Sequence, residues 1–258
     1  MDGSRNRENE LVVCRDVEEL NRRTAEQFVR LARESVAATG RFTVALSGGS
    51  TPKALYSLLA GQTFQPLVPW PRVYFFWGDE RCVSPDHPES NYGMARETML
   101  DKVPVPTENV YPVPTEEGNA QRVAAEYERI LSTFFDLNEG QQPRFDLILL
   151  GMGEDGHTAS LFPGTAALQE MGTVTANDIQ KLGTHRITLT IPAINQAAHI
   201  VFVVSGPSKA SVLKEVLEGQ YQPTRLPSQS IQPVEGELLF LVDRAAASEL
   251  TPSGDKQE

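Results

Sequence analysis

Short apolar runs alternate with helical patterns along the whole chain. Seven runs rich in Val, Ile, Leu and aromatic residues predict β-strands. Most of these runs are continuous rather than alternating with polar residues, which is typical of strands buried on both faces of a mainly parallel sheet. The predicted strands are Leu11–Cys14, Phe42–Leu46, Val73–Trp77, Phe145–Leu150, His185–Leu189, Ile200–Val204 and Leu238–Val242.

Helix signals occupy the segments between these runs. Asp16 followed by Glu19 forms an acidic capping box ahead of apolar residues at helical spacing. Thr51 followed by Pro52 predicts the N-cap and first position of a helix that ends near Leu59. Two further helices are predicted, one by the longest apolar stripe and one by a run that stops at Gly219: Ala120 to Leu137, and Ser208 to Glu218.

The repeated strand–helix–strand order predicts a doubly wound α/β fold, with a mainly parallel sheet flanked by helices. We expect one domain over residues 1–258, with flexible ends at about residues 1–9 and 251–258. In open α/β sheets, ligands bind beyond the carboxyl ends of the strands. The loops after the predicted strands are therefore where functional residues are expected.

Composition narrows the class of partner. Of the 258 residues, 40% are hydrophobic, and 34 acidic residues against 23 Lys and Arg give a net charge of −11. Such a charge disfavours binding to nucleic acid or to an anionic membrane, but it leaves room for a small anionic substrate held by a local cluster of cations. The chain has no apolar run near the ~20 residues that span a bilayer, and its two cysteines, Cys14 and Cys82, suggest reduced thiols. We therefore expect a cytoplasmic protein.

The first candidate loop is Ser47-Gly48-Gly49-Ser50-Thr51, which joins a strand to a helix start. Glycines allow a ligand to approach the backbone, hydroxyls donate hydrogen bonds, and a helix N-terminus offers free N–H groups. The loop is not a Walker A sequence. It predicts phosphate binding, and the alternative is an ordinary glycine turn with a threonine cap.

The second candidate loop is Gly78-Asp79-Glu80-Arg81. Charged residues directly after a buried strand suggest an arginine that binds an anion and a carboxylate that orients it or a substrate hydroxyl. The alternative is a surface pair between Arg81 and a neighbouring acid. No histidine close in sequence supports Cys82 as a nucleophile.

The third candidate loop, Gly151 to His157, contains a literal G-x-G-x-x-G. The dinucleotide-binding motif must open a long helix, whereas Pro163-Gly164 interrupt the chain soon afterwards, so we reject that interpretation. What remains is a glycine-rich turn that presents Asp155 and His157. Histidine is a natural general base near neutral pH, and the alternative is a structural histidine satisfied by the backbone.

Two cations follow the later strands. Arg186 is either a second anion contact or a charge at the sheet edge, and Lys209 is either an anion contact or a solvated lysine. A lysine in a first helical turn is unfavourable against the helix dipole, and a bound anion would offset that cost. The chain lacks the H-x-x-x-H, C-x-x-C and H-E-x-x-H spacings, so we expect no metal site.

Taken together, these motifs resemble the 6-phosphogluconolactonase family, a Rossmann-like α/β family related to glucosamine-6-phosphate deaminases. The resemblance runs from about Val12 to Leu250 and rests on five segments in the expected order. These are Leu46 to Pro52, Gly78 to Arg81, Gly151 to Gly164, Arg186 to Thr190 and Gly206 to Lys209.

The resemblance implies hydrolysis of 6-phospho-D-glucono-1,5-lactone without a cofactor, with His157 as the base that activates water. Asp155 or a backbone carbonyl would orient His157, and Asp79 would orient Arg81 or a sugar hydroxyl. The phosphate would be held by Ser47, Gly48, Gly49, Ser50, Thr51, Arg81, Arg186 and Lys209. A functional link to glucose-6-phosphate dehydrogenase, which supplies the lactone, is also implied.

Two other functions remain open. A sugar-phosphate deaminase or isomerase would be expected to carry an Asn-Glu pair before Pro163, where this chain has Leu161-Phe162. A non-catalytic sugar-phosphate sensor would bind its ligand without turnover and would usually be joined to a DNA-binding domain.

Overall fold

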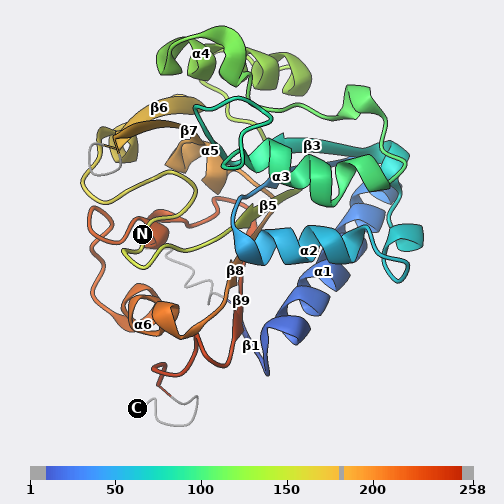
Figure 1. Cartoon of the computed structure of the whole chain (residues 1–258). Helices are drawn as coiled ribbons and strands as arrows, with labels where there is room; N and C mark the ends of the chain where they lie inside the picture. Colours follow the sequence, from blue (N-terminus) through green and yellow to red (C-terminus); the bar gives the residue numbers. More distant parts are fainter. Residues whose placement is uncertain (1–9, 180–182, 252–258) are drawn as a thin grey trace, which may run out of the picture.

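The computed structural model describes residues 10–179 and 183–251. Its centre is a parallel six-stranded sheet with the strand order β1-β9-β8-β5-β2-β3, in agreement with the predicted doubly wound α/β fold (Figure 1). The strands are β1 (Glu10–Cys14), β2 (Phe42–Leu46), β3 (Val73–Trp77), β5 (Leu147–Leu150), β8 (His199–Val204) and β9 (Glu237–Asp243). The inner strands are fully buried, which accounts for their continuous apolar sequences.

A second, antiparallel sheet has the order β4-β7-β6. It consists of β4 (Asp79–Arg81), β7 (Thr184–Leu189) and β6 (Val174–Ile179). The predicted strand His185–Leu189 therefore exists, but it is antiparallel and lies outside the large sheet. Asp79–Arg81, read from the sequence as part of a loop, is a short strand that pairs with β7.

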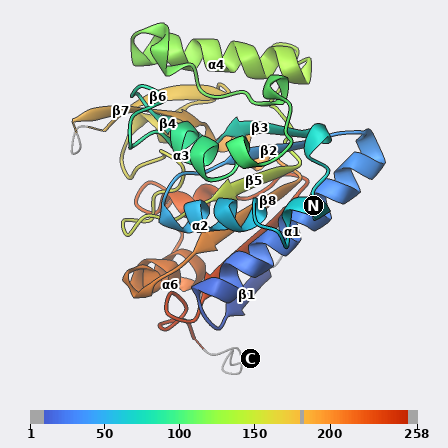
Figure 2. The ribbon, with the colours of Figure 1, turned by 45° about the vertical axis from the view of Figure 1, so that its right-hand side comes forward.

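Helices cover both faces of the large sheet. They are α1 (Val17–Thr39), α2 (Ser50–Leu59), α3 (Asn91–Thr98), α4 (Ala120–Phe135), α5 (Ile191–Asn195) and α6 (Ala210–Glu218). Helices α1 and α2 lie side by side on one face, and α6 lies on the other (Figures 1 and 2). Helix α4 packs across β6 and β7, at the top of both views. None of these helices, nor any other in the described ranges, could span a bilayer.

Two predicted helix starts are wrong by two residues each. Helix α2 begins at Ser50, because Gly49 adopts a φ of 110° and takes the N-cap position that we predicted for Thr51. The segment Pro207–Lys209 is a 3₁₀ turn, and α6 begins after it at Ala210. The Asp16 cap is as predicted, since its carboxylate accepts from the Glu19 N–H at 2.8 Å.

Helix α4 is attached to the end of β3 through a buried tyrosine. The Tyr127 hydroxyl accepts from the Trp77 N–H at 2.8 Å and donates to the Trp77 carbonyl at 3.0 Å. This contact holds the point where the chain leaves the large sheet for β4. The predicted flexible ends lie outside the described residues except for Thr251, whose N–H and hydroxyl both donate to the Glu218 carboxylate.

Candidate active site

The loop after β2 is held at its first residue. The Tyr56 hydroxyl, on α2, accepts from the Ser47 N–H at 3.1 Å and donates to the Ser47 carbonyl at 2.7 Å. Burial raises the pKa of Tyr56, so the hydroxyl stays protonated and keeps both bonds. No side chain caps the N-terminus of α2, which begins directly after Gly49. The uncapped N–H groups of such a terminus are suited to bind an anion.

Gly48 lies directly against Asn91, the first residue of α3. A Cβ atom at position 48 would lie 1.7 Å from Asn91 Oδ1, so only glycine fits there. Asn91 Nδ2 in turn donates to the Asp79 carbonyl at 2.9 Å. Asn91 therefore connects the first candidate loop to the second. The sequence analysis missed it, although Ser90 before it is a recognisable N-cap that accepts from the Gly93 N–H.

Asp79 is buried at the start of β4 and contacts the His157 loop rather than Arg81. The Asp79 carboxylate accepts from Ser160 Oγ at 2.7 Å. Ser160 is itself fixed, because its N–H donates to Thr188 Oγ1 and its carbonyl accepts from Asn177 Nδ2. Within the described residues, no bond between Asp79 and the Arg81 side chain is found. The second predicted role of Asp79, orienting a sugar hydroxyl, stays a prediction.

Glu80 is a structural anchor. Its buried carboxylate accepts from two groups on each oxygen. These donors are the N–H groups of Arg81, Asn91 and Tyr92 and the hydroxyl of Ser90. Burial raises the pKa of Glu80, against the effect of these donors. Since the Glu80 carboxylate is occupied in this way, the predicted alternative of a simple surface pair with Arg81 does not describe it.

Arg81 and Arg186 face each other across the antiparallel sheet. They are direct register partners on β4 and β7, and such partners place their side chains on the same face. The Arg81 guanidinium also donates to the Glu89 carbonyl. Burial, and then the positive charge of Arg81, lower the pKa of Arg186. Two guanidinium groups on adjacent strands are the kind of arrangement that suits an anion, so the predicted anion-binding role of this pair stays a prediction.

The third loop brings Asp155 and His157 into direct contact. Asp155 Oδ1 lies 2.6 Å from His157 Nδ1 and also accepts the His157 N–H at 3.2 Å. Burial alone would raise the pKa of Asp155, but its bonds to His157 leave that pKa below its ordinary value. In the neutral imidazole, this bond places the ring proton on Nδ1, so that Nε2 carries the lone pair that a general base requires.

Part of the glycine turn is already used internally. The Gly153 N–H donates to the His157 carbonyl at 2.8 Å, and the Gly156 N–H donates to the Gly153 carbonyl at 3.1 Å. These two N–H groups are thus unsuited to stabilise an oxyanion. Cys82, which directly follows β4, is a free thiol whose pKa is raised by burial, which disfavours a nucleophilic role.

The loop after β8, residues 205–209, lies beside the first and the third candidate loops. The Thr51 and Ser205 hydroxyls are 2.8 Å apart, and Lys209 Nζ lies 4.0 Å from the Glu154 carboxylate. The Gly206 N–H donates to both oxygens of the buried Asp243 carboxylate at 3.1 Å, which fixes the start of this loop. The loops after the parallel strands β2, β3, β5 and β8 therefore lie at the carboxyl end of the large sheet, whereas Arg186 lies on β7 in the small sheet.

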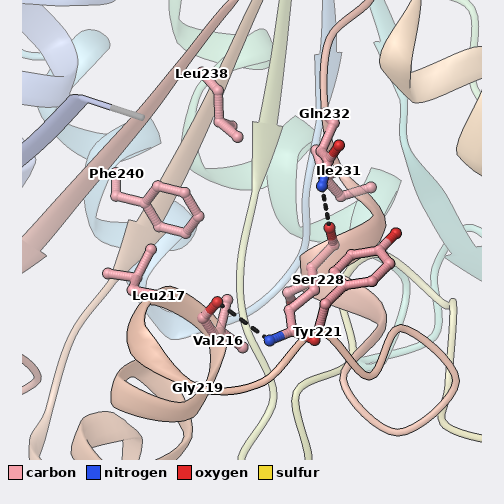
Figure 3. A pocket seen from close by; sticks show the side chains of 10 residues that line it. Val216, Leu217, Gly219, Tyr221, Ser228, Ile231, Gln232, Leu238 and Phe240 are labelled. Atoms are coloured by element: carbon pink, nitrogen blue, oxygen red, sulfur yellow. Dashed lines mark hydrogen bonds between the residues drawn. The ribbon is translucent and has the colours of Figure 1, made fainter. Parts of the chain in front are cut away.

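The turn Pro227–Ser230 contacts the third candidate loop, which carries His157. The Ser228 N–H and Oγ both donate to the Gly156 carbonyl, at 3.0 and 2.9 Å. This turn also lines a cavity of about 120 Å³ between α6 and β9, with Leu217, Leu238 and Phe240 on one side and Ile231 and Gln232 on the other (Figure 3). None of the predicted site residues lines this cavity, so it lies outside the candidate site. Among the described residues, no group of three or more His, Cys, Asp or Glu side chains is placed to hold a metal ion.

The chain belongs to the family of glucosamine-6-phosphate isomerases and 6-phosphogluconolactonases, whose model matches residues 15–240. It is 50% identical over 215 residues to the 6-phosphogluconolactonase of Nostoc sp., covering 82% of this chain and 86% of that one. Identity to the 6-phosphogluconolactonase of Synechocystis sp. is 47% over 219 residues, covering 85% and 89% of the two chains.

Solved structures agree with this assignment. The 6-phosphogluconolactonase from Trypanosoma cruzi superposes with a TM-score of 0.85 at 31% identity, covering 95% of this chain and 97% of that one. A monomeric glucosamine-6-phosphate deaminase superposes with a TM-score of 0.79 at 20% identity, covering 93% and 99% of the two chains, and shows the shared fold alone.

Proposed function

We propose that this protein hydrolyses 6-phospho-D-glucono-1,5-lactone to 6-phospho-D-gluconate in the oxidative pentose phosphate pathway. The names of its relatives at 47–50% identity support the reaction class. The observation that carries the proposal is the Asp155–His157 pair, with 2.6 Å between Oδ1 and Nδ1, at the ligand-binding end of the sheet. An oriented neutral imidazole is the group that water needs in order to attack a lactone carbonyl.

The phosphate of the substrate would bind between the first loop and the two arginines. Gly48, Gly49, Ser50 and Thr51 offer the uncapped N-terminus of α2 and its hydroxyls. Arg81 and Arg186 supply paired positive charge, and Lys209 supplies a third cation. The buried Ser47 Oγ has no hydrogen-bond partner within the described structure. This fits a polar lining that a ligand completes.

In the proposed mechanism, His157 Nε2 takes a proton from water as the water oxygen bonds to C1 of the lactone. The tetrahedral intermediate then breaks the bond between C1 and the ring oxygen. His157 returns its proton to that oxygen, which becomes a hydroxyl, and the new carboxylic acid ionises in water. Asp79 orients a sugar hydroxyl. General base catalysis supplies roughly 10²–10⁴-fold, and orientation of the water adds to it.

These residues supply the whole reaction without a metal or an organic cofactor, which is part of the proposal. We also propose that residues 1–258 act as one domain. A cytoplasmic location beside glucose-6-phosphate dehydrogenase, which would deliver the lactone before it hydrolyses spontaneously, completes the proposed role. The deaminase alternative is disfavoured because Leu161-Phe162 provide no acid before Pro163.

The test is to generate the lactone in situ and to follow its loss against the spontaneous rate, with chelator and with unphosphorylated gluconolactone as controls. We expect acceleration that survives chelator and depends on the phosphate. His157→Asn should lower kcat by at least 100-fold with little change in KM. His199→Asn is the matched control, since His199 bonds the Asp146 carbonyl away from the candidate loops. Loss of lactone at only the spontaneous rate would exclude a lactonase, and ammonia release from glucosamine 6-phosphate would then indicate a deaminase.

A further inference from the structure

The ring of Phe162 lies over the imidazole of His157. The two ring centroids are 4.1 Å apart and the planes differ by 23°, which is a stacked arrangement. Phe162 is half-buried, yet it is not one of the residues that pack against the hydrophobic core of the described structure. Burial of apolar surface in the core therefore does not explain its position, whereas contact with the proposed base does.

We propose that Phe162 is a positioning residue that fixes the plane of the His157 imidazole, an inference that rests on the proposed role of His157 as the base. Asp155 contacts the edge of the ring at Nδ1. A single hydrogen bond at one nitrogen still allows the ring to tilt about the line joining the two atoms. A flat partner on the face removes that freedom, so the edge contact and the face contact together fix the direction of Nε2.

The backbone around Phe162 is held firmly enough to serve this role. Leu161, on one side, is completely buried. On the other side, the Thr165 N–H and hydroxyl donate to the Phe162 carbonyl at 3.3 and 2.9 Å, and Asn177 Nδ2 donates to Thr165 Oγ1 at 3.1 Å. The backbone at Phe162 is therefore held by Thr165 and, through Asn177, by β6, independently of the contact with His157.

The turn between His157 and Phe162 contains one residue in an unfavourable backbone conformation. Ala159 adopts a φ of 48°, in the left-handed region that favours glycine. It allows the chain to reverse between His157 and Leu161, where the Leu161 N–H donates to the Thr158 carbonyl at 2.9 Å. This reversal places residue 162 back over residue 157.

The role predicts a specific kinetic signature. A His157 ring that points in the wrong direction slows the chemical step without weakening phosphate binding. Small displacements of reacting groups have large effects on rate. We expect Phe162→Leu to lower kcat by about 10- to 100-fold with KM nearly unchanged. Phe162→Tyr keeps the aromatic face and should restore most of the rate. Tyr221→Leu removes an aromatic side chain that is 64% exposed, and it should leave kcat as in the unchanged protein.

A spectroscopic measurement tests the contact separately from the reaction. In the unchanged protein, the ring current of Phe162 should shift the carbon-bound imidazole protons of His157 upfield in the NMR spectrum, and Phe162→Leu should abolish this shift. Melting temperatures of all variants show whether they remain folded. An active protein in which Phe162→Leu keeps its kcat, or in which the shift is absent, would overturn this proposal alone. A protein without lactonase activity would overturn the proposed function, and this proposal with it.

Discussion

Arg81 and Arg186 are direct partners across the antiparallel pair of β4 and β7, so that two guanidinium groups share one face of the small sheet. Like charges at such positions destabilise a folded sheet. The arrangement is favourable once an anion lies between them, and the pKa of Arg186, lowered by burial and by Arg81, reports the same conflict. If this pair binds the phosphate as proposed, the stability of the protein should depend on its ligand.

Removing one of these arginines should weaken binding of the phosphorylated substrate. A charge-assisted hydrogen bond contributes roughly 1.5–3 kcal/mol. Arg81→Ala should therefore raise KM by about 10- to 100-fold, with a smaller effect on kcat and none on the slow turnover of unphosphorylated gluconolactone. Steady-state kinetics with both lactones measures this. A KM that stays unchanged for the phosphorylated lactone would remove Arg81 from the phosphate site.

Removing one arginine of this pair should weaken substrate binding but stabilise the ligand-free protein. Arg186→Gln relieves the repulsion and should raise the melting temperature of the ligand-free protein slightly, by an amount matching about 0.2–1 kcal/mol. Added inorganic phosphate should stabilise the unchanged protein more than the variant. Thermal melts with and without phosphate measure both effects. Equal stabilisation of the two proteins by phosphate would contradict the shared site.

Gly48 should tolerate no side chain. A Cβ atom there would lie 1.7 Å from Asn91 Oδ1, so either the first loop or the start of α3 must move. We expect Gly48→Ala to lower the free energy of unfolding by about 1–3 kcal/mol and to raise KM. Gly172→Ala is the control, since the new Cβ would lie 3.4 Å from Glu128 Oε1, at an ordinary van der Waals distance. In a double-mutant cycle, Asn91→Ala should remove most of the additional cost of Gly48→Ala, and purely additive effects would contradict the contact.

Glu19 should make stability depend on pH in the acid range. Hydrogen bonds from the Arg15 N–H and guanidinium and from Arg23 lower the pKa of Glu19 from 4.5 to about 2. Because the folded-state pKa is lowered, the stabilisation is complete above the ordinary carboxyl pKa and is lost as the pH falls towards 2. The difference in melting temperature between the unchanged protein and Glu19→Gln should thus shrink from pH 7 to pH 2. Glu34→Gln breaks one exposed pair with Arg30 and should have little effect at any pH.

The strands of the large sheet could be predicted from the sequence because they are runs rich in apolar residues. The small sheet was harder to predict. Strand β4 consists of three charged residues, Asp79, Glu80 and Arg81, and it is a strand only because β7 pairs with it. Strand β6, Val174–Ile179, includes polar residues and has no continuous apolar run. Strand β4 depends on its pairing with β7, more than 100 residues further along the chain, and local patterns do not contain this information. Strand β6 pairs with the neighbouring β7 and was missed because of its polar sequence.

The same distinction applies to the site. The Asp155–His157 contact joins residues two positions apart in one turn, so it followed from the sequence. Asn91, Ser160 and Ser228 were missed because each acts on a partner that is distant in the chain. The stacking of Phe162 on His157 depends on the left-handed φ of Ala159. An alanine in the sequence does not predict a left-handed φ.

The support of the His157 loop by Ser228 leads to the last prediction. Its N–H and Oγ both donate to the Gly156 carbonyl, and the serine is 1% exposed. Ser228→Ala removes only the hydroxyl bond, so we expect the free energy of unfolding to fall by about 1 kcal/mol and kcat to fall by less than 10-fold. Ser57→Ala, which removes an exposed bond to the Lys53 carbonyl within α2, should leave both quantities nearly unchanged. Denaturant unfolding and lactone turnover measure the two effects. A Ser228→Ala protein that lost stability but kept its kcat would show that the turn stabilises the fold without positioning His157.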